Sequence, residues 1–431
     1  MLAPQPYMNN FLDKIFFRSQ NLDYVSKNLK DITINTHANK IFDAINSYSE
    51  NSEARYVGGC VRKVIKKEAI DDIDLATNLK PKEVCEALKK NQIDYYETGI
   101  EHGTITALID KQKYEITSLR KDVVTDGRHA KIAFSSDWKE DAERRDFSIN
   151  SIYSDKNGNL FDPNNGKKDL EEGFINFIGD TENRIKEDYL RILRYIRFFT
   201  NYSNHKHRPE TIKIIKRNID GISKLSSERL LDEFKKLTNS KNFLKLFEDD
   251  LSLELIYLIF PQFKNLEKFK KLNFFAKNNI FNIDFIFLLS LLVIDETDNT
   301  EYFLYKFNIS KKDQKRLKMI HSFYNEGIDI KKYTEKNLNK YLYYNGNEAV
   351  IDIINFKIFT SNKVEKKLIN LLKNYKDKII PIIPITAKTL MTDFNIPEGK
   401  TLGNKFKSIE EIWVNNGFKI SDKQVQKVIK S

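Results

Sequence analysis

The chain has 431 residues, of which 31% are charged and 40% hydrophobic, and its formal net charge at pH 7 is +11. This length exceeds what one hydrophobic core supports, so we expect several domains. The longest apolar run, residues 285–294, is too short for a membrane span, which needs about 20 apolar residues, and predicts a buried helix. The basic excess favours a polyanionic partner, although a lysine-rich enzyme without such a partner has the same charge.

Cysteine usage and the N-terminal segment indicate the compartment. Cys60 and Cys85 form neither a metal-ligand spacing nor a disulfide framework. Residues 1–20 lack a charged start followed by an apolar stretch, so no signal peptide is expected. We therefore expect a cytoplasmic protein in a reducing environment.

Strand patterns characterise the first part of the chain. Alternating stretches rich in β-branched residues occur at residues 55–59, 102–109 and 114–119, with turn residues between them. Residues 81–90 show a helical pattern between two of these stretches. The mixture predicts an α/β or α+β domain over the first ~155 residues.

The rest of the chain has a helical pattern. From about Glu182 onward, long amphipathic stretches contain few glycines. Residues 162–173 are rich in turn-forming residues and are interpreted as a connecting loop and hinge. Pro381 and Pro384 follow a basic stretch and predict the start of a last, small helical domain.

Two adjacent glycines, Gly58 and Gly59, lie between a short strand and a helix-like stretch. Glycines at such a place let backbone amides approach a phosphate closely, and the following helix N-terminus adds positive potential. Arg62, one turn into that helix, is placed to hold a phosphate oxygen. An ordinary turn without a ligand is the alternative interpretation.

Asp72 and Asp74 alternate around one isoleucine. On a strand, alternate residues share a face, so both carboxylates point the same way. Two negative charges at so short a distance repel each other, which is costly unless a divalent cation lies between them. Glu115 lies on another expected strand that can pair beside them, so three carboxylates predict an oxygen cage for magnesium and in-line nucleotidyl transfer. Two solvated acids in a loop are the alternative.

Residues 143–151 place Arg144, Arg145 and Asp146 together before an apolar stretch. An adjacent Arg and Asp can hold a ribose, because the carboxylate accepts hydrogen bonds from hydroxyl groups while the guanidinium donates them. The alternative is a surface ion pair of little energetic value.

Residues 186–199 form an amphipathic helical pattern. On a helical wheel, Asp188 and Arg191 share a polar face with Arg194. Asp188 and Arg191 thereby offer a hydrogen-bond acceptor beside a donor, one turn apart. Arg197 falls on the apolar side, where it needs a partner or a phosphate. The alternative is an i,i+3 salt bridge between Asp188 and Arg191, worth ~0.2–0.5 kcal/mol.

Taken in order, these and neighbouring segments resemble the class II CCA-adding transfer-RNA nucleotidyltransferases and poly(A) polymerases of the DNA polymerase beta superfamily. The segments are GGCVR, DDIDLAT, TGIEHGTITALI, YEITSLRKD, DGRHAKIAF, ERRDFSINS, FDPNNGKKDL, EDYLRILRYIRF and SERLLDEFKKL. The resemblance is dense over residues 40–240, thins through the middle helices and returns weakly at residues 385–403.

The resemblance implies the architecture. We expect an α+β fold, in which a nucleotidyltransferase head with a mixed β-sheet and helices is followed by an all-α neck, body and tail. The implied domains are the head at residues 1–155 after a short N-terminal helical segment, the base-reading neck at 156–245, the body at 246–375 and the tRNA-binding tail at 376–431.

The resemblance also implies residue roles and a reaction. The implied roles are triphosphate contact by Gly59 and Arg62, metal binding by Asp72 and Asp74, ribose reading by Arg145 and Asp146, base reading by Asp188 and Arg191, and completion of the nucleotide site by Arg194 and Arg197. The residue patterns above add Gly58 to the nucleotide-binding residues and Glu115 to the catalytic ones. The implied reaction is template-independent addition of CCA to the 3′ end of tRNA from CTP and ATP, with Mg2+ as cofactor and release of pyrophosphate. The protein is expected to be a monomer or a weak homodimer.

The chain departs from the family pattern at a few places. Lys63 stands where an aspartate is usual, and Asp71 adds an acid before the metal pair. Tyr189 replaces a frequent proline, while Ser148 and Ser151 replace threonine and alanine. None of these changes removes a residue assigned to chemistry.

Other functions remain open. Bacterial poly(A) polymerases share the head, but they tend to have an arginine-rich strand where this chain has TGIEHGTITALI. An enzyme that adds only CC, or only the final A, fits the same residues. A non-catalytic RNA-binding protein is disfavoured by the intact Asp72, Asp74 and Arg145. A small-molecule nucleotidyltransferase would not need the long basic helical region.

Overall fold

The computed structural model of the chain describes residues 24–125, 130–325 and 333–430. The segment 1–20, for which no signal peptide is expected, and the first four residues of the DGRHAKIAF motif, 126–129, lie outside the described residues. The chain forms two compact units, Met1–Phe243 and Leu244–Ser431.

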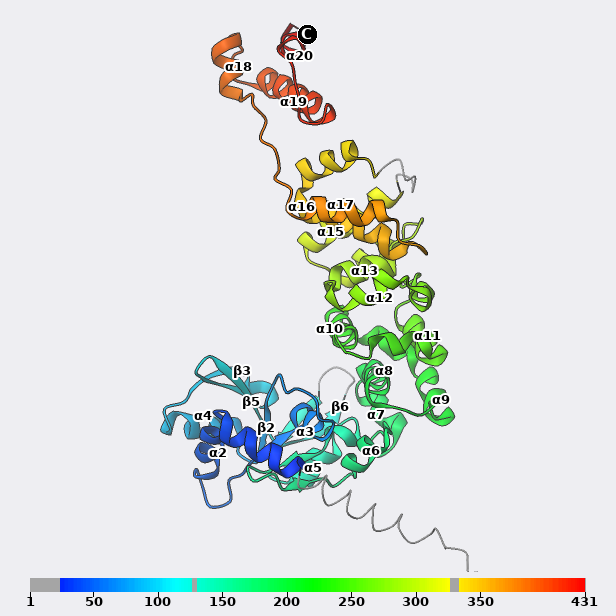
Figure 1. Cartoon of the computed structure of the whole chain (residues 1–431). Helices are drawn as coiled ribbons and strands as arrows, with labels where there is room; N and C mark the ends of the chain where they lie inside the picture. Colours follow the sequence, from blue (N-terminus) through cyan, green and yellow to red (C-terminus); the bar gives the residue numbers. More distant parts are fainter. Residues whose placement is uncertain (1–23, 126–129, 326–332, 431) are drawn as a thin grey trace, which may run out of the picture. The chain divides into compact units, whose positions relative to one another are not determined.

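In the first unit, strands and helices are mixed along the chain up to β9, and helices follow (Figure 1). The strands are β1 (Ala54–Val57), β2 (Asp74–Thr77), β3 (Asp94–Gly99), β4 (Thr104–Ile109), β5 (Gln112–Ser118), β6 (Arg120–Thr125), β7 (Ala130–Phe134), β8 (Tyr153–Ser154) and β9 (Leu160–Phe161). The helices are residues 24–35, α2 (Ala38–Asn46), α3 (Gly59–Ile65), α4 (Pro81–Lys90), η1 (Ile100–His102), α5 (Trp138–Glu143), η2 (Ser148–Asn150), α6 (Gly166–Glu172), α7 (Thr181–Glu187), α8 (Leu190–Tyr202), α9 (Pro209–Arg217), η3 (Ile219–Lys224) and α10 (Ser227–Thr238).

Seven of the described strands form one mixed sheet in the order β3-β4-β5-β2-β1-β8-β9, and β6 pairs with β7 in a separate sheet. Neighbouring strands of the large sheet are antiparallel except β2 and β5, which run parallel. In that parallel pair, Asp74 lies opposite Glu115. The expected α+β head is confirmed, and two of the three expected carboxylates lie side by side on its central strands.

The local patterns explain these elements. On β5, Tyr114 and Ile116 are buried while Glu115 between them is exposed, which is the two-residue alternation of a strand with one covered face. Helix α4 begins with Pro81 in its first turn, where a missing N–H costs nothing, and Glu83 Oε2 accepts from the backbone N–H of Lys80 at 2.7 Å. The strands and the helix expected here from the sequence are therefore present.

Residues 162–173, interpreted from the sequence as a loop and hinge, contain helix α6. The carboxylate of Asp162 accepts from the backbone N–H groups of Gly166 at 2.7 Å and Lys167 at 2.8 Å, so it caps the first turn. A Cβ added at Gly166 would lie 2.0 Å from the backbone oxygen of Ser148. The loop interpretation was wrong, because this connector is a capped helix packed closely against the preceding segment.

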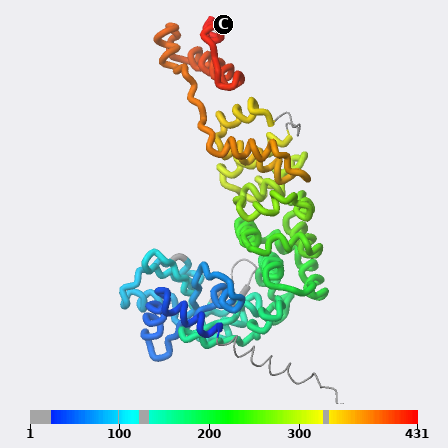
Figure 2. The backbone as a smooth tube through the Cα atoms, in the orientation of Figure 1, coloured from blue at the N-terminus to red at the C-terminus, as the bar shows by residue number. Residues whose placement is uncertain are grey.

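The second unit is helical throughout its described residues, and Figure 2 shows the backbone tube coiling in helices along it. Its helices are η4 (Phe243–Glu248), which begins at the last residue of the first unit, α11 (Asp250–Ile259), η5 (Leu266–Lys271), α12 (Phe274–Asn279), η6 (Ile280–Asn282), α13 (Phe285–Val293), α14 (Asn299–Phe307), α15 (Lys311–Asn325), α16 (Glu335–Thr360), α17 (Lys366–Lys376), α18 (Ala387–Phe394), α19 (Lys400–Asn415) and α20 (Asp422–Lys430).

The apolar run at residues 285–294 forms the buried helix α13, as expected. None of the helices in the described ranges is both long enough and apolar enough to span a membrane. Helices α15, α16 and α17 share one hydrophobic core, while α18, α19 and α20 contribute to another, built around Leu390, Ile409 and Val425. The proline-containing segment at 381–384 lies between these two cores.

Candidate active site

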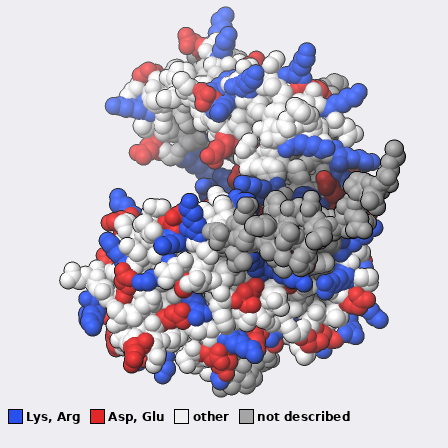
Figure 3. Space-filling view, turned by 60° about the horizontal axis from the view of Figure 1, so that its bottom comes forward, with Lys and Arg blue, Asp and Glu red and all other residues white. Residues whose placement is uncertain are grey.

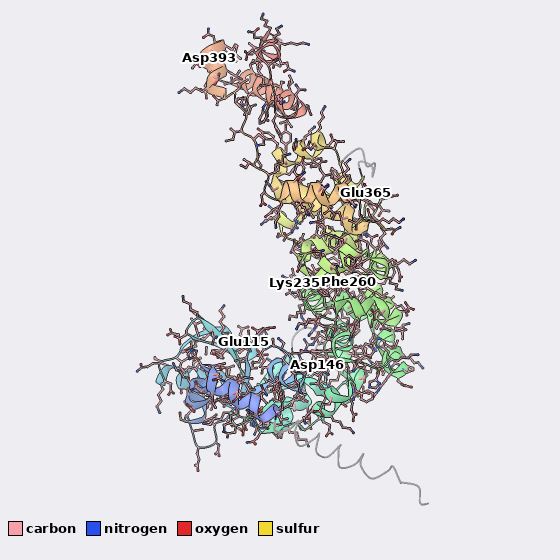
Figure 4. All side chains as sticks on the ribbon, viewed as in Figure 1. Glu115, Asp146, Lys235, Phe260, Glu365 and Asp393 are labelled. Atoms are coloured by element: carbon pink, nitrogen blue, oxygen red, sulfur yellow. The ribbon has the colours of Figure 1, made fainter. Side chains whose placement is uncertain are left out.

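The first unit contains a cavity of about 1050 Å3 between the sheet, helix α3 and helices α8 and α10. Every residue that the sequence assigned to the site lines it. These residues are Gly58, Gly59, Arg62, Asp72, Asp74, Glu115, Arg145, Asp146, Asp188, Arg191, Arg194 and Arg197. Figure 4 labels Glu115 on the sheet and Asp146 near the helices that follow it. The structure therefore brings together residues spread over 140 positions of the chain, from 58 to 197.

The glycine pair keeps the entrance to α3 open. Gly58 caps the helix with φ 67°, a left-handed conformation that favours glycine. A Cβ at Gly59 would lie 3.7 Å from Asp74 Oδ2, and one at Gly58 would lie 4.0 Å from Arg145 Nη1. The glycine turn therefore lies directly beside a carboxylate and a guanidinium that line the same cavity.

The acidic side of the cavity consists of Asp72, Asp74 and Glu115. The sequence predicted Asp72 and Asp74 on one strand. Strand β2 begins at Asp74, however, so Asp72 lies in the segment just before it. The strand starts there because residues 71–73 pair with no neighbouring strand. The prediction that Asp72 and Asp74 share one face of a strand was therefore wrong, although all three acids line the cavity.

The two neighbouring acids disfavour the charged form of Asp74. Burial first, and then the negative charges of Glu115 and Asp72, raise the pKa of Asp74 from 3.8 to about 6. Arg145 and Arg62 oppose this shift but do not cancel it. Within the described ranges, no three His, Cys, Asp or Glu side chains are gathered as a complete metal-ligand set. The carboxylate oxygens and their mutual repulsion nevertheless fit a hard divalent cation, which would relieve that repulsion.

Arg62 lies beneath the glycine turn and is 8% exposed. Its Nη1 donates to Asn150 Oδ1, and its guanidinium lies 4.9 Å from the centre of the Phe198 ring. Its buried Nε–H finds no acceptor among the described residues. Arg62 lines the cavity, although this one donor is itself covered by protein atoms.

Arg145 and Asp146 are adjacent in sequence, but each side chain forms its hydrogen bonds with other residues. Arg145 Nη2 donates to Asp141 Oδ2 at 2.9 Å, and Asp146 Oδ2 accepts from Arg194 Nε at 2.6 Å. Asp146 is 7% exposed and Asp141 only 1%. The alternative of a surface ion pair is therefore wrong, because both carboxylates are buried and each has a different arginine.

Asp141 holds two arginines of the cavity at once. Its Oδ1 accepts from Arg144 Nη2 at 2.7 Å, in addition to the bond from Arg145, and the hydroxyl of Tyr153 donates to its Oδ2 at 2.7 Å. Burial opposes its ionisation, yet the two guanidinium groups hold the pKa of Asp141 well below its usual range.

The expected single helix across residues 186–199 is interrupted. Helix α7 ends at Glu187 and α8 begins at Leu190, and Asp188 between them has extended backbone angles of φ −154° and ψ 106°. Asp188 and Arg191 do not form the i,i+3 salt bridge. Arg191 Nη1 instead donates to Glu187 Oε2 at 2.6 Å, and Arg229 Nη2 on α10 donates to Asp188 Oδ2 at 2.7 Å.

Arg197 has the partner that its position on the apolar side requires. Its Nε donates to Glu233, a residue of α10 that is 1% exposed. The other oxygen of Glu233 lies 3.7 Å from Arg194 Nη1. One buried carboxylate of α10 thus lies between two arginines of α8.

Sequence reasoning missed several residues of the site. Asp141, Asn150, Arg229 and Glu233 hold the assigned side chains, and the end of α10 adds a polar rim. The rim residues are Lys236, Asn239, Ser240, Lys241 and Asn242. The segments ERRDFSINS and SERLLDEFKKL, which contain Asn150, Arg229 and Glu233, carried the family resemblance but suggested no role for these three residues.

Two departures from the family pattern compensate each other. Lys63 Nζ lies 2.7 Å from Asp71 Oδ2. Both residues line the cavity. The lysine in place of the usual acid and the additional acid therefore form one ion pair, and their net charge is zero.

Comparisons with known families agree with this geometry. The family model described as "Poly A polymerase head domain" matches residues 54–176. A second model, described as "Probable RNA and SrmB- binding site of polymerase A", matches residues 208–266.

Solved structures share the fold. The Bacillus stearothermophilus CCA-adding enzyme in complex with CTP superposes with a TM-score of 0.69 at 20% identity, covering 91% of this chain and 96% of that one. The Thermotoga maritima CCA-adding enzyme complexed with tRNA_CCA gives a TM-score of 0.61 at 19% identity, covering 94% and 98%. At these identities the likeness concerns the fold alone.

Sequence relatives are closer. The human mitochondrial CCA tRNA nucleotidyltransferase 1 is 41% identical over 224 residues, which are 51% of this chain and 52% of the human protein, so the match spans about half the length of that relative. The CCA-adding enzyme of Staphylococcus haemolyticus is 32% identical over 337 residues, which are 77% of this chain and 80% of that protein. With a match of that extent, the chain belongs to the family of CCA-adding enzymes.

Proposed function

We propose that this chain adds CCA to the 3′ end of tRNA from CTP and ATP, without a nucleic-acid template. The observation that carries the proposal is the single cavity in which three carboxylates and the arginines assigned to the nucleotide face one another. Such a cavity can hold a nucleoside triphosphate by its phosphates while leaving carboxylate oxygens for a cation.

In the proposed reaction, the terminal ribose 3′-hydroxyl attacks the α-phosphorus of the incoming nucleotide. A new P–O bond forms, the bond to the bridging oxygen of the pyrophosphate breaks, and pyrophosphate leaves. Nucleotidyltransferases of this family are metal-dependent, and we propose Mg2+ held by Asp72 and Asp74. Held there, the ion would lower the pKa of the attacking hydroxyl and would stabilise charge on the leaving group.

The protein's own residues bind and orient the nucleotide. Arg62 and the Gly58–Gly59 turn are proposed to contact the triphosphate, and Arg145 and Asp146 the ribose. The carboxylate of Asp141 holds Arg145 in place, because it accepts two hydrogen bonds from that guanidinium, at 2.9 and 3.1 Å. Little reorganisation of the site is then needed when the nucleotide enters.

Asp188 and Arg191 are proposed to read the base. A carboxylate only accepts hydrogen bonds and a guanidinium only donates them. Cytosine and adenine both present an amine donor beside a ring-nitrogen acceptor and match this pair. Uracil and guanine present a carbonyl and a ring N–H instead, so they are mismatched.

The proposed macromolecular partner is tRNA, in a cytoplasmic location. The net charge of +11 supports a polyanionic partner. Figure 3 shows many Lys and Arg side chains scattered over the visible described surface, interspersed with acidic ones. Both cysteines, Cys60 and Cys85, are free and buried, which suits a reducing compartment.

Incubating the purified protein with tRNA that lacks its CCA end, with each labelled nucleotide in turn and in combination, tests the proposal. We expect two C residues with CTP alone and a complete CCA with CTP and ATP together. A long run of A from ATP alone would identify a poly(A) polymerase instead. Addition that stops at CC, or that needs a CC end, would identify a partial enzyme, and no incorporation at all would contradict the proposal.

A further inference from the structure

Helix α3 carries two adjacent cations that reach different parts of the cavity. The guanidinium of Arg62 lies 4.9 Å from the centre of the Phe198 ring, on the side of helix α8. Lys63 Nζ lies 2.7 Å from Asp71 Oδ2, next in sequence to Asp72. Lys63 and both of these aspartates line the cavity. Lys63 is therefore a positive charge on the acidic side of the cavity, and the proposed function assigns it no role.

The ion pair of Lys63 is far more exposed than the pairs that hold the arginines of the site. The side chain of Asp71 is 72% exposed, whereas that of Asp141, which holds Arg145, is 1% exposed. An exposed lysine–carboxylate pair contributes little to stability, because water competes for both charges. A phosphate can therefore replace Asp71 as the partner of Lys63 at little cost.

The chemistry of the transfer determines which phosphate reaches this side. In an in-line displacement, the attacking hydroxyl and the leaving pyrophosphate lie on opposite sides of the α-phosphorus. Arg62 is proposed to contact the triphosphate, whereas Asp72 and Asp74 are proposed to hold the cation that acts on the attacking hydroxyl. The terminal nucleotide of the RNA therefore lies beside these two acids. Its own 5′-phosphate is the RNA phosphate closest along the chain to the attacking hydroxyl.

The carboxylates of this side repel an RNA phosphate unless a cation compensates. Glu68 lines the cavity as well as Asp72, Asp74 and Glu115. The lysine ammonium is a compact charge with three donors on a flexible four-carbon stem, so it can turn from a carboxylate to a phosphate oxygen. Lys63 thus has the charge, the freedom to move and the place that a contact with the end of the RNA requires.

We propose that Lys63 binds the 5′-phosphate of the terminal nucleotide of the tRNA and leaves Asp71 when the RNA enters. This inference rests on the proposed function. It concerns the RNA strand that is extended and not the incoming nucleotide, whose phosphates are assigned to Arg62. It also gives a use to the lysine that stands at position 63, where the family pattern has an aspartate.

Two variants test the contact on tRNA that lacks its CCA end. In Lys63→Ala, KM for tRNA should rise about fivefold, the effect of losing a partly exposed ion pair, while KM for CTP stays within about twofold of wild type. The dependence of log(kcat/KM) for tRNA on log salt concentration should become shallower by about 0.7, the value for one phosphate of a single strand. Lys63→Arg keeps a cation and should stay within about twofold of wild type in all three measurements.

A tRNA whose last internucleotide linkage is an uncharged methylphosphonate tests which phosphate is bound. With the wild-type protein, this substrate should have a KM about fivefold above that of unmodified tRNA. With Lys63→Ala the modification should raise KM no further, because each change removes the same contact. If the neutral linkage raises KM equally in both proteins, Lys63 does not bind that phosphate and the proposal is wrong.

Two control variants separate this role from a structural one. Asp71→Ala removes the ion pair but leaves the ammonium group, so KM for tRNA should not rise. Lys156→Ala removes an equally exposed type of pair, with Asp43 at 3.2 Å, in the same unit but outside the lining of the cavity. It should also leave KM for tRNA unchanged.

Three results would overturn the proposal. A loss in either control equal to that in Lys63→Ala would make the effect structural or one of general charge. A rise confined to KM for CTP would place Lys63 on the incoming nucleotide. Unchanged KM and salt dependence in folded Lys63→Ala would leave the lysine without a ligand. A wild-type protein that incorporates no nucleotide contradicts the proposed function instead, so the two failures are distinguishable.

Discussion

Asp74 lies where burial and two other carboxylates all disfavour its charge, and Arg145 and Arg62 favour it. A carboxylate with this balance is costly to ionise in the folded protein, and we expect a bound cation to lower that cost. Its properties can therefore be tested both in catalysis and in the stability of the metal-free protein.

Asp72→Ala and Asp74→Ala should each lower nucleotide incorporation by at least about a hundredfold, with normal circular dichroism, because one remaining carboxylate of the pair does not hold the metal needed for transfer. Asp71→Ala is the matched control, since Asp71 is exposed and pairs with Lys63. It should retain activity within about threefold. Turnover within tenfold of wild type in either Asp72 or Asp74 variant would contradict the assignment.

Asp74→Asn should stabilise the metal-free protein near neutral pH. The folded pKa of Asp74, about 6, exceeds its ordinary value of 3.8, so the folded state binds this proton more tightly. The contribution of this carboxyl to the free energy of unfolding is complete below 3.8 and is lost as the pH rises through 6.

In a chelating buffer, thermal unfolding should therefore show a higher midpoint for Asp74→Asn than for wild type at about pH 8, and no difference near pH 4. Adding Mg2+ at pH 8 should raise the midpoint of wild type but not of the variant. A midpoint difference that is independent of pH would show that Asp74 is not perturbed in this way.

Sequence patterns located the charged residues of the site but not their partners. Asp74 beside Glu115 was predictable, because strand alternation and pairing place residues of neighbouring strands on one face. The pairing of Asp146 with Arg194 spans 48 positions, and that of Arg62 with Asn150 spans 88. No periodicity encodes a contact at that separation, so a buried neutral amide such as Asn150 gave no signal.

At the scale of elements, the interruption between α7 and α8 decides which partners hold Asp188 and Arg191. In a continuous helix, Asp188 and Arg191 would form a salt bridge with each other, and neither side chain would be available to a ligand. With the break at Asp188, Arg191 donates a hydrogen bond to Glu187 instead, and Arg229 donates one to Asp188. The proposed reading pair is therefore held by neighbours rather than by itself.

Asp188→Ala should relax base selection, raising the use of UTP and GTP relative to CTP and ATP by about tenfold, since a bidentate contact discriminates by ~1–3 kcal/mol. Arg191→Ala should lower all incorporation as well. Arg229→Ala should shift selection in the same direction as Asp188→Ala but less, because it removes only the support.

Arg217→Ala serves as the control for these variants. Arg217 pairs with Glu182 at the surface of the same unit and does not line the cavity. An unchanged ratio of kcat/KM for CTP over UTP in Asp188→Ala would leave α8 as a scaffold without a reading role.

The elements themselves were predictable where local chemistry determines them. Helix α4 follows from Pro81 and an amphipathic pattern, and α13 from its apolar run. Helix α6 was missed because the asparagines before it and the glycine at its start resemble a turn. Only the cap from Asp162 and the close packing of Gly166 against Ser148 make that segment helical.

At the scale of the whole molecule, catalysis and RNA binding are expected to use different units. The nucleotide cavity lies in residues up to 242, whereas a separate hydrophobic core near the C-terminus involves α18, α19 and α20. If residues 376–431 bind tRNA, as proposed, their removal should therefore weaken tRNA binding without weakening nucleotide binding.

Affinity for tRNA should fall steeply with salt and depend little on its sequence, because A-form helices are recognised by shape and phosphate contacts. Removing residues 379–431 should weaken tRNA binding by at least about tenfold while nucleotide affinity stays within about twofold. Binding isotherms at several salt concentrations measure both. A dissociation constant independent of salt, or equal losses of tRNA and nucleotide binding, would contradict this division.

The most direct measurement is the sequence of the 3′ ends formed when the wild-type protein acts on tRNA lacking CCA, with Mg2+ and all four nucleoside triphosphates present. Template-independent reading by Asp188 and Arg191 predicts ends that finish in CCA and then stop, and no addition by Asp74→Ala under the same conditions. Ends extended by U or G, by long runs of A, or not at all would contradict the proposal that this cavity adds CCA to tRNA.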